Sequence, residues 1–202
     1  MDRRILLVGL GTLLLLTIVI TSVILFAGSD QLRGTYYAQP YPVAAEIKLA
    51  RADGSNFKLS DLRGNLVLLF FGYTSCPDVC PTTLAQLKLA LEALEPSQAE
   101  QVKVLLVTVD PGQDSPERVQ EYVNRFNPSF IGFSGTEAQL ATVWSDYGIF
   151  REIVKDNSAA GYSVEHTARV TLIDRNGNLR DSFPTDAPLE DIVHDIKLLL
   201  KE

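Results

Sequence analysis

The sequence predicts an α/β fold in which a mixed sheet is flanked by helices, with an N-terminal hairpin and a single N-terminal transmembrane helix. Short apolar runs alternate with stretches of helical spacing, an Asn-Gly turn separates two late strand patterns, and residues 5–27 contain no charge. We divide the 202 residues into a cytoplasmic tip and transmembrane anchor at 1–27, a tether at 28–43 and one folded domain at 44–202.

The uncharged N-terminal segment is long enough to span a bilayer. Its 23 residues, at about 1.5 Å each, exceed the hydrocarbon thickness of about 30 Å, and no signal-peptidase pattern follows them. Arg3 and Arg4 precede the segment and are expected to stay in the cytoplasm. The four residues that precede it are too few to form an organelle presequence. We therefore expect an uncleaved, single-pass protein of a bacterial inner membrane, with its C-terminal domain on the periplasmic side.

The strands and helices of the domain follow from local patterns. Residues 28–43 lack periodicity, whereas 45–65 has two extended runs around Asp53-Gly54 and predicts a hairpin. Apolar runs or turn signals predict the strands, which are 66–71, 102–109, 130–133, 168–174 and 179–183. Helical spacing and N-cap residues (Ser115, Thr136, Asp186) predict the helices, which are 81–94, 115–126, 136–147 and 186–200. Parallel crossovers, then a hairpin and a closing helix, make a thioredoxin-like layout.

Charge composition narrows the range of partners. The chain has 18 basic and 25 acidic residues, and the part after residue 27 has 16 and 24. A domain with this acidic excess is not expected to bind nucleic acid or anionic lipid surfaces.

The two cysteines, Cys76 and Cys80, are the most informative residues. They follow the first buried strand and open a helix, where backbone N–H groups and the helix dipole favour thiolate over thiol. A structural disulfide would close a loop of about five residues and contribute roughly 2 kcal/mol, which is little for a domain of this size. The pair therefore indicates either redox chemistry or binding of a soft metal.

A metal site would need further ligands. Of the two histidines, His194 lies in the final amphipathic helix and is interpreted as structural or solvent-facing, whereas His166 lies in the loop entering a central strand, at the sheet edge of the cysteine loop. Two thiolates and an imidazole suit copper or zinc, and structural zinc normally takes four protein ligands, so copper fits better. Asp78 and Glu165 are either supporting acceptors or solvated, which the sequence leaves open.

Redox chemistry is the rival interpretation. Thioredoxin-type enzymes carry C-x-x-C and a cis-proline facing it, whereas this chain has C-x-x-x-C and Ala168 in the matching position. Efficient thiol exchange is therefore less supported, and it is not excluded.

Three segments together resemble one family. They are G-Y-T-S-C-P-D-V-C-P-T-T-L from Gly72, V-T-V-D-P-G-Q-D-S-P-E from Val107 and E-H-T from Glu165 with L-I-D at 172–174. They resemble the landmark blocks of the Sco/SenC proteins, which are membrane-anchored, thioredoxin-like copper-binding proteins that help assemble cytochrome c oxidase. The resemblance covers roughly residues 40–202. Glu165, where aspartate is commoner, and Gly112-Gln113, where an acidic residue commonly follows the D-P, depart from the pattern without touching a ligand.

The resemblance implies the function and the site. Cys76, Cys80 and His166 would hold one copper ion and deliver it to the CuA centre of cytochrome c oxidase subunit II. Another copper chaperone or a thioredoxin-like reductant would be a further partner. Two alternatives stay open: a thiol-disulfide oxidoreductase that uses Cys76 and Cys80 as its redox dithiol to keep the oxidase cysteines reduced, and a redox or copper sensor. Whether the protein is an enzyme is therefore left open.

Overall fold

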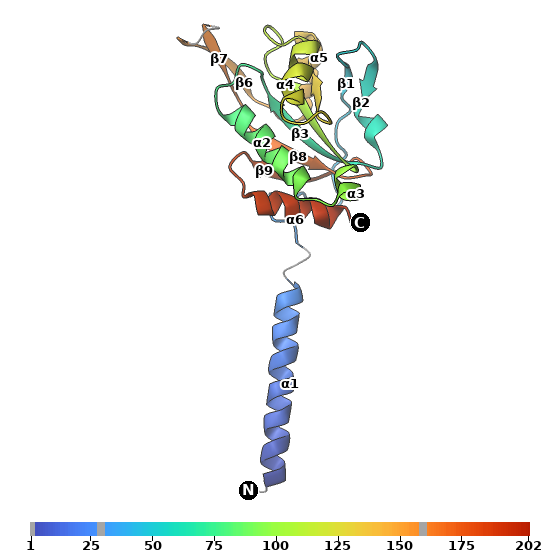
Figure 1. Ribbon diagram of the computed structural model, residues 1–202, viewed down its shortest axis with the longest axis vertical. Coiled ribbons are helices and arrows are strands. Elements are labelled where there is room, and N and C mark those ends of the chain that lie inside the picture. The colour runs from blue at the N-terminus through green and yellow to red at the C-terminus, as the bar shows by residue number, and fades with distance from the viewer. Residues whose placement is uncertain (1–2, 28–30, 158–160) are drawn as a thin grey trace. The chain divides into compact units, whose positions relative to one another are not determined.

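A five-stranded mixed sheet organises the folded domain (Figure 1). The computed structural model describes residues 3–27, 31–157 and 161–202, and residues 33–202 form one compact unit. The strand order is β5-β4-β3-β8-β9, in which β3, β4, β5 and β9 run in one direction and β8 is antiparallel to both of its neighbours, β3 and β9. The strands are β3 (Leu66–Gly72), β4 (Val102–Thr108), β5 (Ile131–Phe133), β8 (Arg169–Ile173) and β9 (Leu179–Pro184). The predicted thioredoxin-like α/β class is thereby confirmed.

Strand β3 lies at the centre of the sheet and of the core. It pairs with β4 on one side and β8 on the other, and all seven of its residues are buried. Helices cover both faces of the sheet, so β3 needs apolar side chains on both faces, and its continuous apolar run satisfies this requirement.

Helices α2, α4 and α6 cover one face of the sheet. Helix α2 (Val79–Glu92) connects β3 to β4, and α4 (Pro116–Asn124) connects β4 to β5. Both connections move in the same direction across parallel strands, so right-handed crossovers put both helices on the same face. Helix α6 (Leu189–Leu199) packs beside α2, as Figure 1 shows.

The opposite face is covered by α5 (Glu137–Asp146) and the β1–β2 hairpin. The Tyr147 ring, just after α5, packs against Phe71 with 5.6 Å between centroids, and Phe57 of β2 packs against Phe133 at 4.4 Å. Phe71 and Phe133 are both in register with Val107 and so share one face of the sheet. The hairpin strands are β1 (Lys48–Ala50) and β2 (Asn56–Lys58), as predicted, and a short 3-10 helix (Leu59–Leu62) follows them.

Several local predictions are confirmed and others are wrong. Ser115 and Thr136 cap α4 and α5 by accepting hydrogen bonds from Arg118 N and Gln139 N. Helix α6 begins at Leu189 with Pro188 in the N-cap position, so Asp186 is not its cap. Two further elements were not predicted: the four-residue helix α3 (Pro96–Ala99) and the hairpin formed by β6 (Arg151–Lys155) and β7 (Tyr162–His166).

Part of the expected tether is paired with the domain. The backbone of Thr35 exchanges two hydrogen bonds with that of Ser182, and Tyr37 N donates to Arg180 O. Val43 forms an isolated bridge with Asn178. The chain from residue 35 onward therefore runs along edge strand β9 and covers its free backbone groups, as exposed strand edges require.

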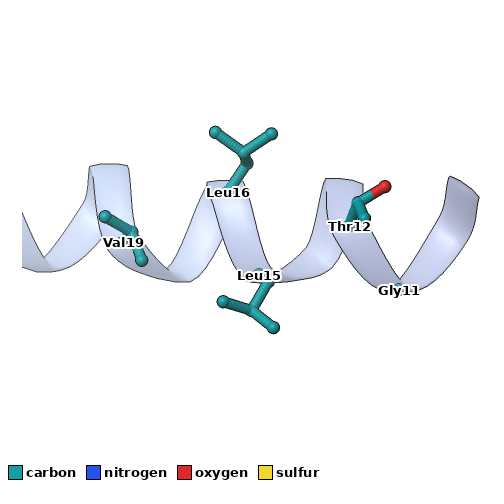
Figure 2. Close-up of a pocket in the computed structure, with 5 residues that line it drawn as sticks. All are labelled: Gly11, Thr12, Leu15, Leu16 and Val19. Carbon is teal, nitrogen blue, oxygen red and sulfur yellow. The ribbon is translucent and has the colours of Figure 1, made fainter. Parts of the chain in front are cut away.

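The N-terminal unit contains helix α1 (Arg3–Ala27). Within the part of the chain that the structure describes, no helix is both long enough and apolar enough to cross a membrane, so the predicted transmembrane helix is not confirmed. A hollow on this helix is lined by Gly11, Thr12, Leu15, Leu16 and Val19, which Figure 2 draws as sticks. Every lining residue belongs to one helix, so the hollow is a groove between side chains rather than a binding cavity.

Candidate dithiol and metal site

The cysteine pair lies in the tight connection between β3 and α2. Cys80 is in the first turn of α2, which begins two residues earlier than predicted, and Cys76 lies in the loop before it. Gly72, the last residue of β3, lies directly under this turn. A Cβ at Gly72 would stand 2.9 Å from Cys80 Sγ, so only glycine lets the buried thiol lie against the strand.

The two thiols are free and differ in exposure. Cys80 is completely buried, whereas Cys76 is only half-buried. The backbone N–H of Cys80 donates to Cys76 Sγ at 3.4 Å. Cys76 is therefore the sulfur that a partner or an ion reaches first.

This asymmetry of exposure is matched by an asymmetry of charge. The hydrogen bond from the Cys80 thiol lowers the pKa of Cys76 to about 5, helped by the backbone N–H groups of Cys80 and Asp78 and by the nearby charge of His166, while burial opposes the shift. The same hydrogen bond, together with burial, raises the pKa of Cys80 well above its usual range. At neutral pH the pair is thus a Cys76 thiolate that accepts a hydrogen bond from a Cys80 thiol.

A buried carboxylate, Asp114, holds the loop before Cys76. Its Oδ2 accepts hydrogen bonds from Thr74 N at 3.0 Å and from Thr108 Oγ1 at 2.6 Å, and its Oδ1 accepts from Thr74 Oγ1 at 2.5 Å. Arg118, one turn into α4, donates to Thr74 Oγ1 and to Ser75 Oγ. Hydrogen bonds from the end of β4 and the start of α4 therefore hold the cysteine loop in place.

Sequence analysis assigned no role to Asp114. The available signal was a carboxylate directly before a Ser-Pro helix start, in the second of the three resembling segments. The donors to its carboxylate come from the cysteine loop and from β4, and no local pattern in the sequence shows that they meet.

His166 lies at the same end of the domain as the cysteine loop. It is the last residue of β7 rather than part of a loop, so that local prediction is wrong. Its ring stands edge-on to the Tyr73 ring with 6.0 Å between centroids, and Tyr73 directly follows β3. Its Nδ1–H donates to the carbonyl of Thr167 at 3.0 Å, because a carbonyl can only accept, so in the neutral form of the ring Nε2 carries the lone pair.

The described residues contain no group of three or more His, Cys, Asp or Glu side chains already gathered around a possible metal position. The donor types nevertheless fit a soft ion, since a thiolate, a second sulfur beside it and an imidazole lone pair lie at one end of the domain. Gathering all three requires the β7 end to approach the cysteine loop.

The other candidates have simpler roles. Asp78 occupies the N-cap position of α2, and its carboxylate accepts a hydrogen bond from Thr82 Oγ1. Glu165 is exposed, and strand alternation puts it on the face opposite His166. His194 lies on α6 and interacts with Asp195 Oδ1 at 2.7 Å, in line with its structural interpretation.

Fold and site together define the class: a thioredoxin-like protein with a thiolate–thiol pair at the start of a helix and a histidine near it. The SCO1/SenC family model matches residues 36–201 of the chain. The chain therefore belongs to the SCO1/SenC family. A more distant structural neighbour, BsSco, is described as a member of the Sco family of cytochrome c oxidase assembly proteins.

Individual relatives agree with this assignment. The chain is 33% identical to the SCO2-like protein RP587 of Rickettsia prowazekii over 93% of its own length and 90% of that protein. It is similar to the solution structure of apo Sco1 from Thermus thermophilus, with a TM-score of 0.76 and 36% identity over 85% of this chain and 99% of that one. It is also similar to copper-bound ScoI of Bradyrhizobium japonicum, with a TM-score of 0.70 and 32% identity over 78% of this chain and 99% of that one.

Proposed function

We propose that this protein is a copper metallochaperone for the CuA centre of cytochrome c oxidase, and that Cys76, Cys80 and His166 bind the copper. The observation that supports this most strongly is the thiolate–thiol pair at the start of α2, with the Nε2 lone pair of His166 at the same end of the domain. Similarity to a copper-bound ScoI supports the choice of ion.

Binding and release follow from the states of the two sulfurs. Cys76 meets the incoming ion as a thiolate, and Cys80 must lose its proton to become the second ligand, so each ion taken up releases a proton. His166 completes the set when the end of β7 approaches. Because Cys76 is partly exposed, a recipient thiolate can share the ion before the donor sulfurs let go, as transfer between proteins requires.

The recipient that we propose is subunit II of the oxidase, through its CuA cysteines, and another copper chaperone would supply the ion. The uncharged stretch 5–27 supports a further proposal, that the chain is anchored in a bacterial inner membrane with the domain on the periplasmic side. Alkaline extraction of membranes tests the anchor: a chain released by carbonate would contradict it.

The central experiment is a copper titration of the purified, reduced full chain, comparing the parent with Cys76→Ser, Cys80→Ser and His166→Ala. We expect one copper per chain in the parent, loss of binding in both cysteine variants, and weaker binding with an altered Cu(II) spectrum in His166→Ala. A His166→Ala chain with the parent's affinity and spectrum would eliminate the three-ligand site.

A second function is favoured by the difference between the two thiols. A partly exposed thiolate of low pKa beside a buried thiol is the arrangement that thiol-disulfide exchange uses, with Cys76 attacking a disulfide and Cys80 resolving the mixed disulfide. The chain would then reduce the CuA cysteines of the oxidase. Reduction of a disulfide-linked CuA peptide that needs both cysteines but not His166 would identify this activity.

A further inference from the structure

We propose that Arg151 and Tyr162 are positioning residues that fasten the β6–β7 hairpin to the end of β4 and so determine where His166 stands relative to the cysteine loop. This inference rests on the proposed copper site. It gives a role to the β6–β7 hairpin, which the sequence did not predict. It also gives a role to Arg151 and Tyr162, neither of which is a proposed copper ligand.

The three side chains share one face of the hairpin. Arg151 is the register partner of His166, so the two side chains project to the same side. Tyr162 is four residues before His166 in β7 and projects to that side as well, with Val164 between them. This is the inward face, since Val164 is buried while Glu165 of the other face is exposed.

Arg151 makes three contacts with neighbouring elements. Its Nε donates to the carbonyl of Val109, the residue after β4, and its Nη1 donates to Glu137 Oε1 at 3.0 Å. Its guanidinium also lies over the Trp144 ring, 4.7 Å from the ring centre. Trp144 is itself held by a hydrogen bond from its indole N–H to the carbonyl of Thr108. The planar guanidinium is therefore held on its edge and on its face, which a lysine could not reproduce.

Tyr162 makes the second attachment. Its hydroxyl lies 3.1 and 3.2 Å from the two carboxylate oxygens of Asp110, a side chain that is only 2% exposed. A carboxylate buried to this extent needs a donor, and the tyrosine hydroxyl supplies it. Arg151 is paired with His166 at one end of the β6–β7 ladder, and Tyr162 lies at the other end. The two attachments together therefore restrict rotation of the hairpin as well as its distance from the sheet.

The end of β4 holds both halves of the proposed copper site. Asp110 N donates to Thr108 Oγ1, and Thr108 in turn donates to Asp114, the carboxylate that holds Thr74 of the cysteine loop. A chain of hydrogen bonds thus runs from Tyr162 to the loop before Cys76. Tyr73 adds a direct link, because Val164 N of the hairpin donates to its hydroxyl at 3.4 Å. The segment at the end of β4 therefore positions both His166 and the cysteine loop.

Neither Arg151 nor Tyr162 is suited to bind a soft ion, so their effect on copper should pass through His166. Residues that orient a metal ligand typically change affinity by about 10- to 100-fold when replaced. We therefore expect Arg151→Ala and Tyr162→Phe each to weaken Cu(II) binding by the reduced full chain about tenfold. Both should shift the Cu(II) absorption spectrum toward that of His166→Ala.

The test is a double-mutant cycle with Cu(II) as the probe. Arg151→Ala and Tyr162→Phe are made in the parent and in the His166→Ala background, with Arg125→Ala and Tyr36→Phe, both at exposed positions, as matched controls. A positioning role predicts that the variants weaken binding in the parent but cause no further loss in the His166→Ala background. Arg151→Lys should recover little, and the controls should match the parent.

Other results would overturn the inference. The inference fails if both variants keep the parent's Cu(II) affinity and spectrum. It also fails if the variants lose as much Cu(II) affinity in the His166→Ala background as in the parent, because the residues would then act through the cysteines or the general fold.

Hydrogen exchange of the metal-free chain separates this inference from the proposed function. If His166→Ala alone leaves copper binding unchanged, the three-ligand site fails, and amide exchange in β6 and β7 then decides the positioning role. Faster exchange there in Arg151→Ala and Tyr162→Phe, with unchanged exchange in β3, supports the attachment. Unchanged exchange in the hairpin overturns it.

Discussion

The backbone N–H of Cys80 points at the sulfur of Cys76 across 3.4 Å, and this contact adds to the hydrogen bond from the Cys80 thiol in making two chemically identical side chains unequal. Helix α2 begins at Val79, so the first turn supplies N–H groups to one sulfur while burying the other. The reactive sulfur is the one that faces outward.

The first prediction concerns the reactivity of Cys76. Because its pKa is lowered to about 5, alkylation by iodoacetamide should have a midpoint near pH 5 and change little between pH 7 and 8. Cys80 should stay unmodified in the folded chain because it is buried. In Cys80→Ala the midpoint should rise toward that of an ordinary cysteine, since the Cys80 thiol is the main cause of the shift. A midpoint near 8 or 9 in the parent would contradict this description of the pair.

The second prediction concerns Asp114. Its carboxylate satisfies donors from the cysteine loop and from β4, and Asp114→Ala would leave these buried groups without their acceptor. We expect the free energy of unfolding to fall by about 2–4 kcal/mol, as for other buried networks that lose a charged member. Urea unfolding measures this loss. The exposed Glu121→Gln on α4 should lie within about 0.5 kcal/mol of the parent, and an equally small effect of Asp114→Ala would mean that the network is not structural.

The third prediction concerns oxidation. A Cys76–Cys80 disulfide removes both thiolates, so the oxidised chain should bind Cu(I) at least about 100-fold more weakly than the reduced chain, and dithiothreitol should restore binding. Competition with a Cu(I) chelator measures both states. Equal affinities would show that the sulfurs are not the ligands.

The fourth prediction concerns pH and the buried pair Asp181 and Asp195. Burial and a hydrogen bond with Asp195 raise the pKa of Asp181 to about 7. The folded state therefore binds this proton more tightly than the unfolded state does. The resulting stabilisation is complete below about pH 4 and is lost as the pH rises toward 7.

Asp181→Asn removes the titrating group, so the pH-dependent contribution of this position to the free energy of unfolding disappears. The variant should gain stability relative to the parent as the pH rises from 4 to 8, by a few kcal/mol at most, at about 1.4 kcal/mol for each pKa unit. Chemical unfolding at several pH values measures the difference between the two chains. The exposed Asp186→Asn is the control, and a difference between Asp181→Asn and parent that stays constant with pH would refute the shifted pKa.

Much of the architecture could be predicted because it depends on local patterns. The apolar run of β3, the N-caps at Ser115 and Thr136 and the turn at Gly177 each contain their own signal within a few residues. The predicted start of α6 was wrong because Pro188 occupies the N-cap position, and the residue before a proline disfavours helical dihedral angles, so the helix does not extend back to Asp186. Strands β6 and β7 were missed because their exposed residues do not alternate cleanly in polarity.

The candidate site, like the fold, has features that local sequence predicts and features that it does not. The side chains that supply the chemistry could be predicted locally, because two thiols at the start of a helix and one histidine before a strand are recognisable within a few residues. Folding was needed to make Cys76 the thiolate, to place Asp114 under its loop, and to bring Arg151 and Tyr162 onto the histidine's face of the hairpin. These relations depend on burial and on hydrogen bonds between residues tens of positions apart, and such distances exist only once the chain has folded.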